Sequence, residues 1–257
     1  MIPARLTFEW QHLTAPELRA CAAADALVIV PVASLEQHGP HLATGVDMVL
    51  AGGVAREAAR RLADRGAEVV VTPVVWTGLA EHHMAFGGTV TLDNAAFQAV
   101  LRGVVGSVAR HGFGRVMLLN GHGGNADAIG VAVTELAAEF GIRVAGGTYW
   151  HIAPEVIAPH LEDQPGLMHA CEAETSLMLH LAPGDVRRER LAEAHGPHTT
   201  RAPGQPPGLL RRRGFREVSE TGVIGDARRA SAEKGEAILE ALGERLAELL
   251  ADPALWA

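Results

Sequence analysis

The sequence predicts an α/β fold, specifically a three-layer α/β/α sandwich around a mostly parallel central sheet. Short apolar, β-branched runs alternate along the chain with longer alanine-rich runs of helical periodicity. This order is typical of βαβ units with parallel strands. The apolar runs are also nearly continuous rather than alternating, which is typical of strands that helices cover on both faces.

Four segments have the composition of such buried strands. They are "ALVIVPVAS" (26–34), "AEVVVTPVVW" (67–76), "RVMLLNG" (115–121) and "RVAGGTYW" (143–150). Ligands of parallel α/β sheets bind beyond the carboxyl ends of the strands. A functional site is therefore expected in the segments that follow these four runs.

Helical segments separate the expected strands. The first begins at Thr14, where Thr14 and Glu17 have the spacing of a capping box. The next helices are expected at about 46–65, 93–112 and 125–140, and a glycine follows or ends each of them. The last helix, at about 229–251, carries one apolar stripe, formed by Leu239, Leu242, Leu246, Leu249 and Leu250.

The segment 195–221 differs from the rest of the chain because it is rich in Pro, Gly and Arg. We expect it to form a surface loop, hairpin or subunit contact of a single domain spanning 1–257. The run "RRR" at 211–213 is expected to be solvated or to contact another subunit, rather than to form a binding site.

Composition excludes several classes of protein. The chain has 257 residues, 48% of them apolar, and a formal net charge of -8. This charge argues against a nucleic-acid-binding surface and against attraction to anionic lipid. No run approaches 18 apolar residues, and the polar N-terminus does not resemble a signal peptide. Cys21 and Cys171 form no disulfide framework, so we expect a cytoplasmic protein.

Histidine and carboxylate residues follow each expected strand. In "SLEQHGPHLATGVD", Glu36 and His38 are two residues apart, so an extended backbone places both on one face. Asp47 can return to them from the start of the next helix. Imidazole with carboxylate suits Zn, Mn or Fe. The alternative is a turn with ordinary polar surface residues.

Two other segments extend this pattern. "NGHGGN" holds His122 between Asn120 and Asn125, and it matches neither a dinucleotide loop nor a P-loop. Its alternative interpretation is a glycine-rich turn with a capping Asn. In "HACEAETS", a helix would place His169 and Glu172 one turn apart. Glu174 then serves another role or lies behind the ligands.

These motifs resemble those of the creatininase family. The matching segments are "PVASLEQHGPHLATGVD", "GLAEHHMAFGGTVTL", "LLNGHGGN", "HACEAETSLMLHLAPGDV" and "GVIGDARRASAEKG". The resemblance implies an α/β/α fold, two divalent metal ions per chain (Zn, Mn or Fe) and hydrolysis of a C–N amide bond by a metal-bound hydroxide. It also implies a homo-oligomer, commonly a hexamer.

The resemblance further implies a ligand set. Glu36, Asp47 and His122 would hold one metal, and His38 and Asp47 the other. Creatininase has a further ligand, a Glu, at the position of Gly124. We therefore expect Glu172 to replace it, with Glu174 as the alternative if the helix turns that residue inward instead. His169 matches the proposed proton shuttle of the family, and Glu174 would orient its imidazole.

The remaining expectations concern the substrate. Glu81 and His82 would contact substrate or a neighbouring subunit, and the backbone N–H groups of Gly123 and Gly124 could hold an oxyanion. Tyr149 and Trp150 either line the pocket or are buried structural residues.

The resemblance favours creatinine or a related cyclic or linear amide as substrate, although Gly124 argues against assuming creatinine. The alternatives are a peptidase of the mycofactocin-maturation type, a formamide hydrolase, and a non-catalytic metal-binding subunit.

Overall fold

The computed structural model describes residues 7–257 except 207, 208, 210 and 212. Its described part contains a sheet of four parallel strands in the order β2-β1-β3-β4. Their bounds are Leu27–Val32 (β1), Val69–Val71 (β2), Arg115–Asn120 (β3) and Arg143–Thr148 (β4). Because β1 and β3 are central and paired from Leu27↔Arg115 to Val32↔Asn120, their carboxyl ends open onto the same edge.

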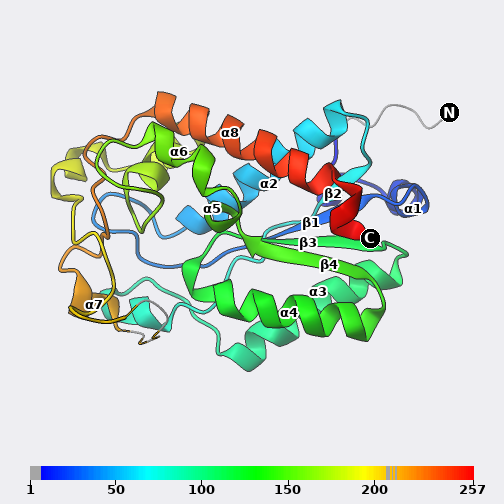
Figure 1. Ribbon diagram of the computed structural model, residues 1–257, viewed down its shortest axis with the longest axis horizontal. Coiled ribbons are helices and arrows are strands. Elements are labelled where there is room, and N and C mark those ends of the chain that lie inside the picture. Colours follow the sequence, from blue (N-terminus) through cyan, green and yellow to red (C-terminus); the bar gives the residue numbers. More distant parts are fainter. Residues whose placement is uncertain (1–6, 207–208, 210, 212) are drawn as a thin grey trace.

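Helices connect and cover these strands (Figure 1). Their bounds are Ala15–Ala23 (α1), Val46–Asp64 (α2), Asn94–Arg110 (α3), Ala126–Phe140 (α4), Tyr149–Ile152 (α5), Glu172–Leu181 (α6), Phe215–Val218 (α7) and Ala232–Ala251 (α8). The predicted capping box of α1 is confirmed, since Glu17 accepts from the backbone N–H and hydroxyl of Thr14. The predicted ends of α2 to α4 hold within two residues.

The predicted three layers are confirmed. In β1, Leu27 and Ile29 belong to one apolar core while Val28 and Val30 belong to the other, so each face of the strand packs against a different layer. Figure 1 shows α2, α6 and α8 on one side of the sheet and α3 and α4 on the other. Of the predicted leucine stripe of α8, all members are buried except the half-buried Leu249.

Two strand predictions were too long. The segment 67–76 forms a regular strand only over Val69–Val71, and the chain rejoins β1 through one bridge at Val75. Pro73 lies between, and proline has no N–H to donate to a ladder. The strand β4 ends at Thr148 because Tyr149 begins α5.

Cys21 and Cys171 are buried free thiols, as expected. Within the described part of the chain, no helix has the length and apolarity needed to cross a membrane.

Candidate metal centre

The loop after β1 places Glu36 and His38 inside the protein. Glu36 is 1% exposed, and its Oε2 accepts a hydrogen bond of 2.9 Å from Ser34 Oγ. His38 Nδ1 lies 3.2 Å from the backbone carbonyl of Glu36. Because a carbonyl only accepts, Nδ1 carries the proton, and Nε2 is left to face the cluster. A metal-binding histidine is commonly oriented in this way.

The loop after β3 positions His122 so that Nδ1, and not Nε2 as in His38, faces the cluster. His122 Nε2 lies 3.1 Å from the carbonyl of Leu79, so Nε2 donates and Nδ1 faces inward. This Nδ1 lies 3.1 Å from both Glu36 Oε2 and Asp47 Oδ2. Asp47 stands in the first turn of α2, and its Oδ1 is 3.2 Å from His38 Nε2. Asp47 therefore lies between the two imidazoles, as a bridging ligand would.

Two buried atoms in this cluster, His38 Nε2 and Asp47 Oδ2, lie within ion-pair distance of Asp47 Oδ1 and His122 Nδ1 but make no hydrogen bond. Buried polar atoms without a hydrogen bond are costly, and a bound cation would satisfy both. Three groups of described residues bring one potential ligand atom each within 4.8 Å of one another. These groups are Glu36–Asp47–His122, His38–His169–Glu174 and Glu36–His83–His169. The arrangement fits two adjacent divalent cations.

The electrostatics of the cluster favour positive charge. Burial alone would lower the pKa of His38, but the neighbouring Asp47 raises that pKa to about 9. Burial likewise opposes protonation of His122, while Glu36 and Asp47 raise the pKa of His122 well above its ordinary value. Burial raises the pKa of Glu174 to about 8, with Asp47 and Glu36 adding to the effect and His38 opposing it. Bound cations would neutralise the charge of the same carboxylates in place of protons.

His169 and His83 lie against the other oxygen of Glu36. His169 Nδ1 is 3.6 Å and His83 Nε2 is 3.3 Å from Glu36 Oε1. His169 Nε2 donates to the backbone carbonyl of Gln37 (2.9 Å), while Gln37 Nε2 is 2.9 Å from His83 Nδ1. Burial lowers the pKa of both imidazoles, which favours their neutral forms. His83 was left without a role by the sequence, although it follows directly after His82 in the same rim segment.

The expected helical turn joining His169 to Glu172 is not formed. The helix α6 begins only at Glu172, and Ala170 has a left-handed φ of 53°. The Glu172 carboxylate is fully buried and pairs with Lys234 Nζ at 2.6 Å, while it also accepts from the backbone N–H of Glu162.

Glu174 occupies the place expected for Glu172. Its Oε2 lies 3.9 Å from His38 Nε2 and accepts from the backbone N–H of Ala170. Two residues, about half a helical turn, therefore separate a carboxylate that faces the cluster from one that faces Lys234. The geometry does not place Glu174 as a hydrogen-bond partner that orients the His169 imidazole.

Position 124 cannot supply a ligand. A methyl group there would lie 2.2 Å from the carbonyl oxygen of Leu79 and 2.3 Å from His122 Nε2. These distances are shorter than any van der Waals contact, so only glycine fits. The structure has no room for a carboxylate side chain at position 124, because His122 and the carbonyl of Leu79 pack directly against this glycine.

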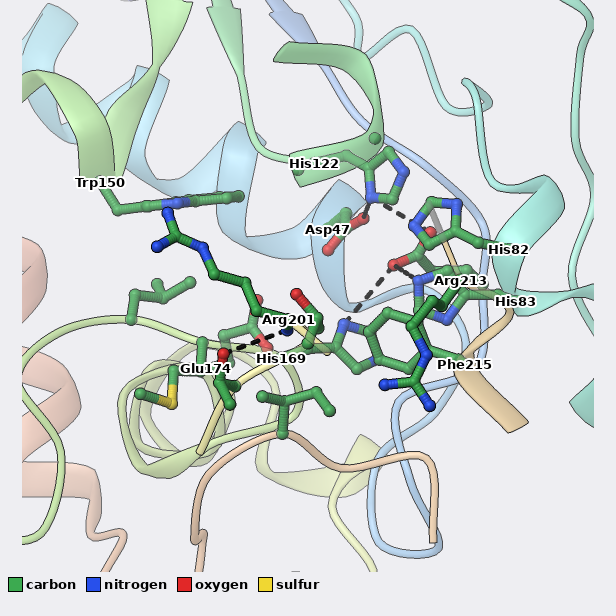
Figure 2. Close-up of a pocket in the computed structure, with 18 of the residues that line it drawn as sticks. Asp47, His82, His83, His122, Trp150, His169, Glu174, Arg201, Arg213 and Phe215 are labelled. Atoms are coloured by element: carbon green, nitrogen blue, oxygen red, sulfur yellow. Dashed lines mark hydrogen bonds and ion pairs between the residues drawn. The ribbon is translucent and has the colours of Figure 1, made fainter. Parts of the chain in front are cut away.

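The cluster forms the floor of a cavity of about 370 Å³ (Figure 2). Of the residues expected to contact substrate, His82, Gly123, Gly124 and Trp150 line this cavity. Glu81 is exposed and lines a neighbouring cavity, which also contains His82, Gly124 and Arg213. Tyr149 is fully buried and is not among the lining residues, which favours the structural alternative for this side chain.

The segment 195–221 contributes directly to the cavity. Arg201, Arg211 and Arg213 all line it, together with Phe215 from α7. Arg211 and Arg213, expected to be solvated or to contact another subunit, therefore line the cavity, and Arg212 lies outside the described residues. Sequence reasoning missed this because the segment is far from the strand ends in the chain and has no regular pattern that fixes its path.

Comparison with known proteins adds a family context. The family model for creatininase, described as creatinine amidohydrolase, matches residues 11–250. A mycofactocin precursor peptide peptidase from Mycobacterium tuberculosis is 37% identical over 84% of this chain and 80% of its own length. A creatinine amidohydrolase from Pseudomonas putida is 30% identical over 89% of this chain and 90% of its own. A solved structure named "Creatininase Mn" has a TM-score of 0.81 and 30% identity over 95% of this chain and 97% of its own.

Proposed function

The chain belongs to the creatininase family, whose members are hydrolases of C–N amide bonds, and from this premise we propose a two-metal amidohydrolase. The observation that supports it most is the buried Asp47 carboxylate, which lies between the imidazoles of His38 and His122 while its Oδ2 and His38 Nε2 make no hydrogen bond. A non-catalytic metal-binding subunit would not require the substrate-sized cavity above them.

The proposed ligands differ from the expected set in one residue. Glu36, Asp47 and His122 would hold one cation, through atoms that already lie within 4.8 Å of one another. His38, Asp47 and Glu174 would hold the other, with Glu174 in the place expected for Glu172. The donors are imidazole and carboxylate without thiolate, which suits Zn, Mn or Fe.

The bound cations would supply an activated water and polarise the amide carbonyl. The protein's own groups perform the remaining tasks. His169 is neutral because burial lowers its pKa, and its Nε2–H is fixed on the carbonyl of Gln37. Its Nδ1 therefore faces the cluster as a proton acceptor and can return a proton to the departing nitrogen. The backbone at Gly123 and Gly124 lines the same cavity and can present N–H groups to a developing oxyanion.

A peptide or linear amide is favoured over creatinine as substrate. A cavity of about 370 Å³ falls in the range that accommodates drug-sized ligands, which are larger than creatinine. The peptidase relatives also share 33–37% identity with this chain, against 30% for the creatinine amidohydrolase. Creatinine and formamides remain the other members of the amide panel to be tested.

The test is hydrolysis by the metal-free protein and by protein reconstituted with Zn, Mn or Fe, assayed on creatinine, formamides and short peptides. We expect metal-dependent release of an amine from at least one class. His169→Ala should abolish this turnover while the metal content stays at the wild-type value. His111→Ala is the matched control, because His111 lies at the end of α3 outside the cavity. Equal turnover with and without metal would contradict the proposal.

A further inference from the structure

We propose that this pocket selects amide substrates that carry an anionic group, a carboxylate or a phosphate, and that Arg201 and Arg211 bind that group. The inference rests on the proposed function, since it names the substrate class of the same site. It adds a recognition element that lies in the segment 195–221, outside the strand-end loops that carry the ligands.

The first observation is the distribution of charge. The whole chain has a formal net charge of -8, whereas 195–221 contains five arginines and two glutamates. Three of these arginines, Arg201, Arg211 and Arg213, line one cavity together with the metal-centre carboxylates. Figure 2 shows the Arg201 side chain extending toward Trp150 on one side and Arg213 beside Phe215 on the other.

The second observation is that two of these guanidinium groups have no partner among the described residues. Among the residues that the structure describes, no carboxylate lies within 4.0 Å of the Arg201 or Arg211 side chain, and neither side chain makes a hydrogen bond. Arg213 is already engaged, because its Nη2 donates to the carbonyl of Glu217 at 2.8 Å. Arg201 and Arg211 are therefore the donors still available to a ligand.

Two nearby arginines outside the cavity are engaged by other residues. Arg216, in the same segment, donates to the carbonyl of Glu220 and lies over the ring of Phe86 at 5.0 Å. Arg229 pairs with both Glu162 and Asp163. What distinguishes Arg201 and Arg211 from other exposed arginines is that they line the cavity of the candidate metal centre.

Chemistry indicates what such a ligand contains. Like charges repel across a cavity, so guanidinium groups facing a site that holds divalent cations are unfavourable until an anion lies between them. The planar fork of a guanidinium matches the oxygens of carboxylate or phosphate and forms strong charge-assisted hydrogen bonds with them. An extended substrate can place its amide at the metal centre and its anionic group at the arginines.

The experiment measures binding to the metal-reconstituted protein by titration calorimetry. Three probes are compared: acetyl-trialanine with a free carboxylate, its neutral C-terminal carboxamide, and acetyl-Ala-Ala-phosphoserine amide, which carries the anionic group on a side chain. A hydrogen bond to a charged group contributes about 10-fold or more to an equilibrium constant, so at least one anionic probe should bind about 10-fold or more tightly than the carboxamide. The anionic probe that binds more tightly shows whether the arginines prefer a carboxylate or a phosphate.

Variants separate the arginines from the metals, which can also bind anions. The double variant Arg201→Gln with Arg211→Gln should reduce the ratio of anionic to neutral affinity to about 1. Arg216→Gln removes the same charge from the same segment outside the cavity and should keep the wild-type ratio. The preference should also weaken as the salt concentration rises.

An anionic preference that survives the double variant would overturn the inference, as would equal affinity for all three probes in the wild type. A change of oligomeric state in the double variant, with loss of affinity for all probes alike, would also overturn it. Because the readout is binding, failure of the proposed function appears separately, as absence of hydrolysis across the amide panel.

Discussion

The two glutamates of α6 provide a stringent test of the metal centre, because they lie two residues apart and face different partners. Glu172 pairs with Lys234 at 2.6 Å, and Glu174 lies 3.9 Å from His38 Nε2. Each is replaced by glutamine, which keeps the size of the side chain and removes its charge. We expect Glu172→Gln to change stability and Glu174→Gln to change metal binding.

The magnitude for Glu172→Gln follows from its surroundings. Removing one partner of a buried ion pair costs about 3–5 kcal/mol. Lys234 is 22% exposed on its side chain and keeps Glu162 as a second partner, which reduces the expected loss of unfolding free energy to about 2 kcal/mol. For a chain of this length, this loss lowers the melting temperature by about 4–8 °C. The metal content should stay at the wild-type value.

Glu174→Gln should have the opposite signature. Burial raises the pKa of Glu174 to about 8 in the metal-free protein. At any pH above the ordinary pKa of a glutamate, folding therefore disfavours the charged form of Glu174. Removing that charge should leave the metal-free protein at least as stable near neutral pH as the wild type. Loss of residues that merely support ligands weakens metal affinity about 10–100-fold, so loss of a direct ligand should weaken one cation at least as much.

The assays are thermal melting of the metal-free proteins and elemental analysis after equilibration with limiting metal. The reasoning is refuted if Glu172→Gln loses one metal and Glu174→Gln keeps both. It is also refuted if the metal-free Glu174→Gln protein melts several degrees below the wild type while the metal content is unchanged.

Three further predictions concern the same site and its surroundings. Saturated protein should hold two divalent ions per chain by elemental analysis, and Asp47→Asn should weaken both because Asp47 faces His38 and His122; a stoichiometry of one would contradict the bridging role. Gly124→Ala should displace His122 and weaken metal binding by about 10-fold or more, since the added methyl group would lie 2.2 Å from Leu79 O. Gly123→Ala, whose methyl group would meet nothing nearer than Trp150 at 3.9 Å, should keep both metals. Sedimentation should show an oligomer, with the family resemblance indicating a hexamer, and a monomer at micromolar concentration would exclude it.

Sequence alone determined the layers and the edge at which the site lies. A strand with a continuous apolar run, such as 26–34, buries both of its faces only when layers cover the sheet on both sides. The alternation of strands and helices makes the sheet parallel. The sequence could bring Glu36, His38 and Asp47 to one candidate site because local geometry fixes them, namely the loop after β1 and the first turn of α2. His122 follows β3 directly and was identified for the same reason.

Tertiary structure alone decided which of the other polar residues reach the metal centre. The choice between Glu172 and Glu174 depends on where α6 begins, which the left-handed turn at Ala170 fixes, and on Lys234, which lies 62 residues away in the chain. Arg201 and Arg211 reach the cavity from a segment without helical or strand periodicity. Local spacing encodes the direction of a side chain within a helix or strand, but the partner it meets is set by long-range packing, which no short stretch of sequence contains.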